Sequence, residues 1–466
     1  MKTHSVFVSL LVASLALPTV AQARGGICDA AQLTTALAAA TSGDTVRIGA
    51  CQITGSFQIP AGVTLRGVNS YASRIVAPIN TDALTLTPGA TTTRVRHLTV
   101  EHDGGIGIGG TGAGSVWVDR VRVRTARGVA IGFEDVSQAA VTHSQVRGPV
   151  DASNADSVDI HTSSLDTATH GVLLVRVADA SVDGVTARGF TNFGILAVES
   201  VTGFWGVLAS QNVGVGVGVF GGSADFDFVS ARRTFSGIRP VGDFPSGVVV
   251  AGGATVTSTG LSSSRSEGFG VFEDGASSDH DFLSSRYNDN AGIWTQNALT
   301  FQLDRSSSSF NDFANVVAVD SAFASISRSA INFAQETTPP GFLSAGDGIQ
   351  LVNTPGDISD VSLIANERAG LIGDLGPTMI VTDIDFSDVF VVGFGDSLGA
   401  ILQQGPVTIS APDDGVTRLG AVAGNDADFI LVNDPIDPAG GVQPCFLPQM
   451  EFLVDAGILD LFDPLI

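Results

Sequence analysis

Residues 171–175 read GVLLV, and residues 194–198, 23 positions further on, read GILAV. The same pattern, a glycine followed by a short run of Val, Ile or Leu, returns after another 22 residues as GVGV at 216–219. Further copies, one of which begins with Asn, occupy 105–108, 128–131, 247–250, 270–272, 292–294, 315–319, 348–351, 370–372 and 399–402. A recurring interval of 22–23 residues indicates a solenoid in which each repeat forms one turn.

Within each repeat, apolar and polar residues alternate over two or three short runs, and none of the repeats has helical periodicity. Residues 225–228 (DFDF) and 279–282 (DHDF) show the alternation. Short strands of this kind bury a face only when parallel turns stack on one another. We therefore predict an all-β, single-domain, right-handed parallel β-helix of about 13 turns, which forms a rod on the order of 60 Å long.

The start of the mature chain carries a motif of its own. Residues 43–48 read GDTVRI and residues 59–67 read IPAGVTLRG, after an Ala- and Leu-rich helical segment at 29–40. This resembles the opening of the pectate-lyase-like right-handed β-helix proteins, in which a short helix caps the first turn. The resemblance covers residues 30–410. It implies the fold and leaves the reaction open.

The chain divides into four segments. Residues 1–23 read as a secretory signal peptide, with an apolar core at 6–17 and an Ala-x-Ala cleavage site that ends at Ala23. We expect residues 24–68 to form the N-terminal cap and first strands, residues 69–410 the β-helix, and residues 411–466 a C-terminal cap. The protein is then secreted or extracytoplasmic.

Export permits disulfide bonds. Cys28 and Cys51 bracket the predicted capping helix, and a bridge between them stabilises by about 3 kcal/mol. This pairing leaves Cys445 as a free thiol.

Composition excludes several classes of function. Asp and Glu number 47 against 23 Lys and Arg, which gives a net charge of −24. A nucleic-acid binder is not expected from this balance. No stretch is apolar and long enough to predict a membrane span. We expect a monomer whose partner is an extracellular polysaccharide or another cell-surface ligand.

Three intervals between repeats are long, and they place insertions at about 232–246, 334–347 and 390–398. Each insertion directly precedes the glycine run that opens a turn, so all three should leave the rod at the same corner. Loops from one edge of a solenoid commonly wall a binding groove. Harmless variation in loop length is the alternative.

Four aspartates are the candidate catalytic residues: Asp225, Asp227, Asp279 and Asp281. Alternation directs them outward and directs Phe226, Phe228, His280 and Phe282 inward. The two pairs should lie two turns apart, about 9–10 Å along the rod. That separation suits an inverting glycoside hydrolase. It also suits a calcium site bridged by other oxygen atoms. Calcium is therefore the candidate cofactor, but the sequence does not predict which residues would be its ligands. A solvated acidic surface is the third interpretation.

The candidate binding residues are Arg176, Glu199, Trp205 and Trp294. Arg176 and Glu199 occupy equivalent positions in neighbouring repeats, which predicts a surface ion pair. Two further groups stand beside these. Arg120, Arg122 and Arg124 form one basic stripe. His161 and His170 lie near Asp159 and Asp166, either as general bases or as polar corner residues.

Motifs of enzymes with this fold match poorly. Residues 117–120 (WVDR) resemble the Trp-Ile-Asp-His run of pectate lyases, with Arg120 in place of His. The sequence thus predicts a secreted β-helix protein that binds an extracellular polysaccharide and, in the enzymatic interpretation, cleaves it as a hydrolase or lyase. The alternative is a non-catalytic adhesive or structural rod, so whether the protein is an enzyme stays open.

Overall fold

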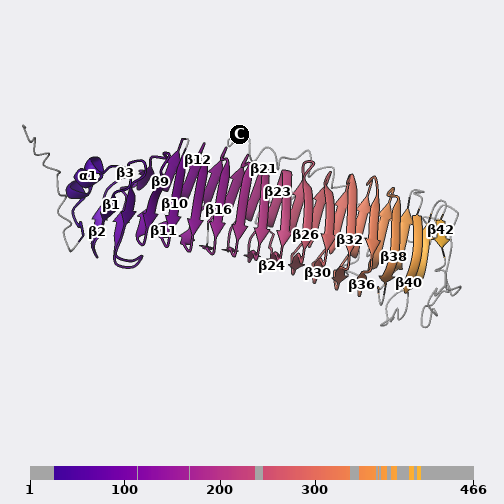
Figure 1. Ribbon diagram of the computed structural model, residues 1–466. Coiled ribbons are helices and arrows are strands. Elements are labelled where there is room, and N and C mark those ends of the chain that lie inside the picture. Colours follow the sequence, from indigo (N-terminus) through magenta and orange to yellow (C-terminus); the bar gives the residue numbers. More distant parts are fainter. Residues whose placement is uncertain are drawn as a thin grey trace, which may run out of the picture.

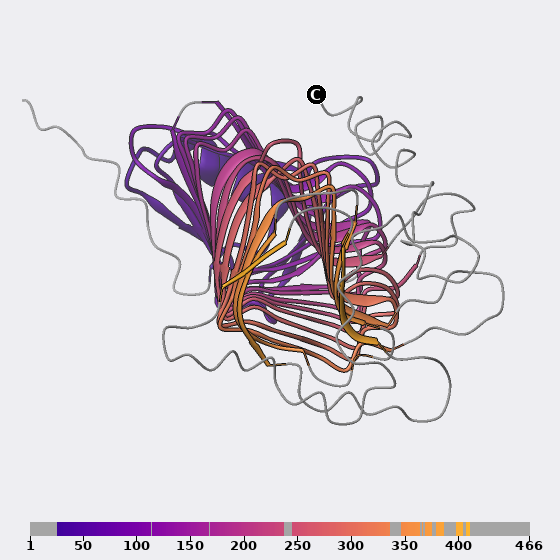
Figure 2. The same cartoon turned by 90° about the vertical axis from the view of Figure 1, so that its right-hand side faces the viewer.

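The computed structural model describes residues 26–410 with gaps at 113, 167, 237–244, 336–345, 364–365, 367–368, 375–378, 386–397 and 404–406. The described chain forms one long rod (Figure 1), and the predicted right-handed parallel β-helix is confirmed. Every strand pairs in parallel with the equivalent strand of the next turn. Viewed from its end, the rod has a three-sided cross-section (Figure 2), and we name its sides the first, second and third faces.

Each turn of the chain visits the third face, then the first, then the second. The first face contains β1 (Thr45–Arg47), β4 (Thr64–Arg66), β7 (Thr93–Arg96), β10 (Ser115–Asp119), β13 (Gln138–Thr142), β16 (Ser157–His161), β19 (Asp179–Asp183), β26 (Thr255–Thr259), β29 (Ser277–Asp281), β32 (Thr300–Asp304), β35 (Ala324–Ser327), β38 (Gly356–Ser362), β40 (Met379–Asp385) and β42 (Val407–Ser410).

The second face contains the shortest strands, which are β2 (Gln52–Thr54), β5 (Arg74–Val76), β8 (Thr99–His102), β11 (Arg122–Thr125), β14 (Gln145–Arg147), β17 (Ser164–Asp166), β20 (Thr186–Arg188), β22 (Leu208–Ser210), β24 (Ser230–Arg232), β27 (Ser262–Ser264), β30 (Ser284–Arg286), β33 (Ser307–Ser309) and β36 (Ala330–Asn332).

The third face contains β3 (Phe57–Ile59), β6 (Leu84–Leu86), β9 (Ile106–Thr111), β12 (Val129–Glu134), β15 (Val150–Ser153), β18 (His170–Val175), β25 (Ser246–Ala251), β28 (Val271–Asp274), β31 (Ile293–Gln296), β34 (Ala314–Val319), β37 (Asp347–Val352), β39 (Ala369–Asp374) and β41 (Leu398–Gln403). Two long strands, β21 (Phe193–Trp205) and β23 (Val215–Asp227), run without a break from the third face into the first.

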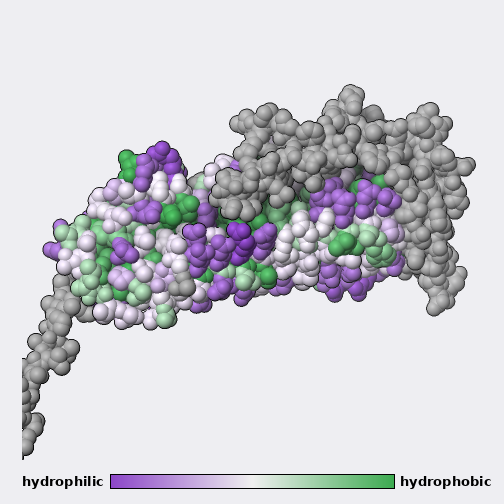
Figure 3. All heavy atoms as spheres, turned by 90° about the horizontal axis from the view of Figure 1, so that it is seen from above, coloured by the Kyte–Doolittle hydropathy of each residue, from purple (hydrophilic) through white to green (hydrophobic). Residues whose placement is uncertain are grey.

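The faces differ in how they meet solvent. First-face strands such as β16 and β29 alternate between buried and accessible residues, which is typical of a sheet with one wet side. Third-face strands such as β18 and β37 are buried at almost every position. Their outward residues, including Leu173, Phe272 and Trp294, form apolar clusters separate from the interior core. Only the first and second faces therefore offer extended rows of accessible side chains. Seen from above, the described surface carries separate hydrophilic and hydrophobic patches (Figure 3).

At the corner between the first and second faces, the predicted inward orientation of two phenylalanines is wrong. Phe226 and His280 point inward and are fully buried, as predicted. Phe228 and Phe282, which were predicted to point inward, are instead 64% and 50% exposed. Both have positive φ angles, 52° and 56°, because they occupy the left-handed corner residue at which the strand alternation ends.

The N-terminal cap is as predicted. Helix α1 (Ala30–Ala39) begins where the Asp29 side chain accepts a hydrogen bond from the backbone N–H of Gln32, and it buries Leu33 and Leu37 against the first turn. The Cys28–Cys51 disulfide is present, with the two Cα atoms 5.8 Å apart. The signal peptide, the C-terminal cap and Cys445 lie outside the described residues. No helix within the described ranges is long and apolar enough to cross a membrane.

The three insertions return to one corner. Ser246 pairs with Val215, Asp347 pairs with Ala314, and Leu398 pairs with Ala369. Each pairing resumes the third face after an insertion. The central parts of the insertions lie outside the described residues.

Candidate functional site

The outward residues of the first face line up in two rows along the rod. Residues that are paired partners on successive turns form a first row: Thr45, Thr64, Arg94, Trp117, Ala140, Asp159, Ser181, Gly203, Asp225, Thr257, Asp279, Gln302 and Ser325. A second row contains Arg47, Arg66, Arg96, Asp119, Thr142, His161, Asp183, Trp205, Asp227, Thr259, Asp281, Asp304 and Ser327. The second row starts with cations, passes through histidine and aspartate, and ends with carboxylates.

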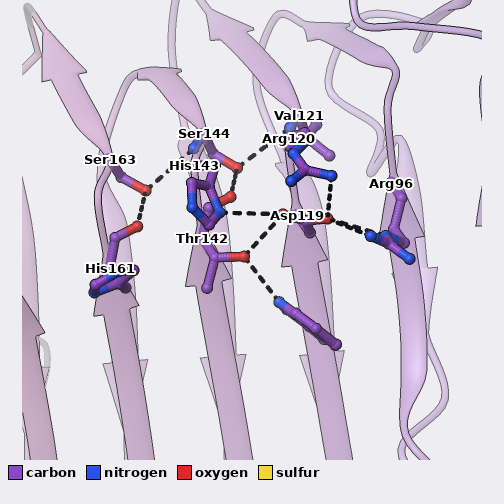
Figure 4. Close-up of polar contacts among 10 residues, drawn as sticks. Arg96, Asp119, Arg120, Val121, Thr142, His143, Ser144, His161 and Ser163 are labelled. Carbon is purple, nitrogen blue, oxygen red and sulfur yellow. Dashed lines mark hydrogen bonds and ion pairs between the residues drawn. The ribbon is translucent and has the colours of Figure 1, made fainter.

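Asp119 is the centre of a polar network (Figure 4). Its carboxylate accepts hydrogen bonds from Nε and Nη2 of Arg96 at 3.0 and 2.8 Å and from the Thr142 hydroxyl at 3.1 Å. The Trp117 indole N–H donates to the same hydroxyl at 2.9 Å. His143 Nδ1 lies 3.4 Å from the carboxylate. These groups hold Asp119 in place although its side chain is only 4% exposed.

The network keeps Asp119 ionised. Burial by itself raises the pKa of a carboxyl group. Here the hydrogen bonds from Arg96 and Thr142, together with the charges of Arg96 and Arg120, outweigh burial, so the pKa of Asp119 is below its ordinary value. Asp119 therefore presents a fixed negative charge to His143.

A second histidine–carboxylate pair follows along the same row. His161 Nδ1 lies 2.5 Å from Asp183 Oδ2, and the His161 side chain is 41% exposed. The other carboxylate oxygen of Asp183 is buried and has no hydrogen-bond partner among the described residues. The rings of His143 and His161 meet edge to face with centroids 5.8 Å apart. Two accessible imidazoles thus stand side by side, each against a carboxylate.

Asp159 adds a carboxyl group whose pKa is raised, whereas that of Asp119 is lowered. It lies in the first row, two residues before His161 on β16. Burial raises the pKa of Asp159, and the nearby charge of Asp183 raises it further, against the opposing effect of His161. The site thus combines a group that holds a proton more readily than usual with imidazoles able to accept one.

An exposed tryptophan continues the row. Trp205 directly follows Asp183 and precedes Asp227 in the pairing register. Its side chain is 54% exposed, so its ring is available for stacking with a sugar. Phe228, at the adjacent corner, is also exposed. We call Asp119, His143, Asp159, His161, Asp183 and Trp205 the central site.

The predicted aspartate pairs project from the first face. Asp225 and Asp279 both pair with Thr257, which places the two pairs two turns apart, as the repeat alignment predicted. Asp225 accepts a hydrogen bond from Thr257 at 2.8 Å. Asp279 and Asp281 border a shallow depression of about 360 Å³.

Arginines pair with two of the three carboxylates at this depression, whereas Asp279 is in no ion pair among the described residues. Arg305 forms ion pairs with Asp281 and Asp304, and Arg328 pairs with Asp304. Neutralised carboxylates make poor proton donors and poor calcium ligands. Within the described ranges, no group of three His, Cys, Asp or Glu side chains is arranged to hold a metal ion. Of the four predicted aspartates, only Asp281 is therefore paired with arginine, and the other three stay candidates beside the central site.

The remaining candidate residues lie elsewhere. Arg176 and Glu199 occupy neighbouring turns at the corner between the third and first faces, but Arg176 donates to Asn154 at 2.9 Å instead of pairing with Glu199. Trp294 is 5% exposed in an apolar cluster of the third face, which removes it from the candidate binding residues. His170 pairs with Asp151 at 2.7 Å on the third face.

The basic stripe is divided among different partners. Arg124 pairs with Glu101 at 3.6 Å, and the Arg122 guanidinium lies over the Tyr71 ring. Arg120 lies 3.9 Å from Asp119.

The roles of Asp183 and His143 were not predicted, although the sequence contains a usable signal. His161 and Asp183 are 22 residues apart, and both Arg96 with Asp119 and Asp119 with Thr142 are 23 apart. Residues separated by one period stack directly on adjacent turns of a solenoid. A search for His and Asp at that separation finds the pair.

Comparisons with known proteins found similar solved structures but no matching family model or curated protein. Among solved structures, the chain resembles the A-module of the Azotobacter vinelandii mannuronan C-5 epimerase AlgE4, with 15% identity, a TM-score of 0.38, and coverage of 83% of this chain and 97% of that one. It also resembles the Dettilon tailspike protein, with 11% identity, a TM-score of 0.42, and coverage of 78% and 62%. The periplasmic alginate epimerase AlgG gives 10% identity, a TM-score of 0.28, and coverage of 82% and 83%.

Proposed function

We propose that this protein binds an extracellular polysaccharide along its first face and acts on it by acid–base chemistry at the central site. The observation that carries the proposal is the pair of accessible imidazoles, His143 and His161, each in contact with a carboxylate on a solvated face. Histidine exchanges protons near neutral pH, and a carboxylate partner fixes its orientation.

Four residues of the central site have distinct roles in this proposal. His161 accepts a proton from the sugar, and Asp183 orients its ring through the 2.5 Å contact. Asp159, whose pKa is raised, donates a proton to the departing or rearranging group. Trp205 lies two turns from His161, about 9–10 Å along the rod, and stacks against a sugar beside the reacting unit.

The third face is an unsuitable binding surface. Along β18 to β34 its outward residues are mainly apolar and buried in two clusters, so they have little free area to offer a hydrated sugar chain. The first face has charged and aromatic side chains in straight rows parallel to the rod. A linear polymer laid along these rows meets equivalent positions on successive turns.

The test uses the purified mature protein with a panel of neutral and acidic polysaccharides. New reducing ends report hydrolysis or elimination, ultraviolet absorbance reports an unsaturated product, and NMR in heavy water reports proton exchange at a sugar carbon without cleavage. We expect at least one signal on one polymer, and a reduction of about 100-fold or more in His161→Gln or Asp159→Asn.

A matched control comes from the same chain. His170→Gln removes a histidine from a similar pair with Asp151 on the third face, and this variant should keep the activity. Equal loss in His161→Gln and His170→Gln would show that folding rather than chemistry is affected. If no polymer changes by any of the three measurements, the catalytic part of the proposal fails and the non-catalytic rod is favoured.

A further inference from the structure

The last residues of eight successive second-face strands form a straight row with arginine on alternate turns. In order along the rod, the pairing register places Arg147, Asp166, Arg188, Ser210, Arg232, Ser264, Arg286 and Ser309 in line. We call Arg147, Arg188, Arg232 and Arg286 the arginine row. All four are exposed. Adjacent members lie about 9–10 Å apart, and the row extends over about 29 Å.

The arginine row forms no ion pair within the described part of the chain, although the net charge is −24 and Asp166 lies in register between Arg147 and Arg188. Arg188 donates its Nε–H to Gln211 at 2.5 Å, Arg232 to Ser230 at 2.8 Å, and Arg286 to Ser284 at 3.0 Å. These neutral contacts fix the base of three of the four guanidinium groups and leave their terminal nitrogens to the surroundings.

Three other arginines, one on the first face and two at its corner with the second face, differ from the arginine row. Arg96, Arg305 and Arg328 are each bound to an aspartate, and such pairs consume the hydrogen-bonding edge of the guanidinium. An exposed guanidinium without a carboxylate keeps that edge for two parallel hydrogen bonds to an external anion. The arginine row therefore presents a line of regularly spaced, available anion-binding groups.

We infer that the arginine row binds a linear anionic polysaccharide, with one carboxylate or sulfate held by each guanidinium. A polymer with an anionic group on every second sugar unit fits the two-turn repeat. Ser210 and Ser264 lie between the arginines and supply neutral hydroxyls opposite the uncharged units. The row shares no residue with the central site, so this inference does not rest on the proposed catalysis.

A nucleic acid fits the row less well. Its phosphates recur about every 3.4 Å along a duplex strand, so most would face no arginine. Single strands bind proteins through base stacking on free aromatic faces. Tyr287, Phe310 and Phe333 at the adjoining corner stack on one another with centroids 5.1 and 5.0 Å apart. This stacking covers both faces of Phe310 and one face each of Tyr287 and Phe333, which leaves few free ring faces for bases.

The experiment measures binding of the intact protein to four polymers of matched length at low and physiological salt. These are a sulfated polysaccharide and a uronate polysaccharide with disaccharide repeats, a neutral polysaccharide, and single-stranded DNA. The test variant is Arg188→Ser with Arg232→Ser and Arg286→Ser. Serine already occupies the intervening turns of this row, so the strands should accept it. The control variant, Arg74→Ser with Arg127→Ser and Arg176→Ser, makes the same change in charge outside the row and outside the first-face strands.

We expect the row variant to bind the better anionic polysaccharide about tenfold more weakly and with a shallower salt dependence. The control variant should change affinity less than about twofold. The comparison of sulfated with uronate polymer identifies the anionic group. Ser210→Arg with Ser264→Arg gives an independent measurement, because it fills the alternate turns and should favour polymers charged on every unit.

Three results would overturn the inference: equal weakening in the row and control variants, tighter binding of DNA than of both anionic polysaccharides, or no binding of either polysaccharide at low salt. His161→Gln separates this site from the proposed function, because it should abolish catalysis while binding by the arginine row is retained.

Discussion

Replacing Asp119 by Asn should destabilise the protein by about 2–4 kcal/mol. The substitution keeps the shape of the side chain and removes the charge that Arg96 contacts through two nitrogens at 3.0 and 2.8 Å. Breaking a buried pair by removing one partner typically costs about 3–5 kcal/mol, while an exposed pair contributes under about 1 kcal/mol. Asp119 is 4% exposed and Arg96 is 29% exposed, so the value should lie between these limits and nearer the buried one.

Asp103→Asn is the matched control. Asp103 contacts Arg127 through the same two nitrogen types, Nε and Nη2, at 2.9 and 3.2 Å, but its side chain is 39% exposed and that of Arg127 is 70% exposed. We expect a clearly smaller loss of stability than in Asp119→Asn, because solvent screens an exposed ion pair. Guanidinium unfolding is followed by far-UV circular dichroism and by tryptophan fluorescence, since Trp117 is hydrogen-bonded to Thr142 in this network. Equal losses in the two variants would refute the argument from burial.

Three further predictions concern Asp119, Asp159 and two glycines. The pKa of Asp119 is lowered in the folded protein, so the stability that its charge contributes is present above the ordinary pKa of 3.8. That stability is lost as the pH falls through the folded-state pKa. The stabilities of wild type and Asp119→Asn should therefore converge in acid unfolding curves. The raised pKa of Asp159 has the opposite sign, so Asp159→Asn should be at least as stable as wild type at pH 7 in thermal unfolding, even though it is expected to lose activity. Gly222→Ala should cost at least about 3 kcal/mol in chemical unfolding, because an added Cβ would lie 2.3 Å from the Ser200 carbonyl oxygen at a φ of +70°; Gly253→Ala, at a similar φ with open space around it, should cost only about 1 kcal/mol.

The repeat interval was enough to predict the fold, because each turn of this solenoid contacts chiefly its neighbours. Alternation correctly placed Phe226 and His280 inside. It failed for Phe228 and Phe282 because a two-residue period does not continue through a left-handed corner residue. The corner position depends on backbone geometry that neither phenylalanine reveals by its type.

The apolar runs of the third face also predict that this sheet is buried on both sides. Runs such as GVLLV at 171–175 have no polar residue on either side of the strand, which is typical of a sheet buried on both faces. This pattern predicts that Trp294, in an equivalent run, is covered. The central site was harder to predict, since the candidate aspartates were chosen for their sequence similarity to each other, whereas Asp183 matters through its contact with His161 one turn away.

The two unbroken strands β21 and β23 have a consequence for how the rod comes apart. A solenoid opens most easily by fraying at its ends, where a turn has a neighbour on one side only. β21 and β23 pair along almost their whole length at the middle of the rod (Figure 1), and Trp205 at the end of β21 is in register with Asp183 on the preceding turn. Their amides should exchange with solvent last, so proteolytic trimming of turns from either end should leave the central site assembled in the surviving fragment.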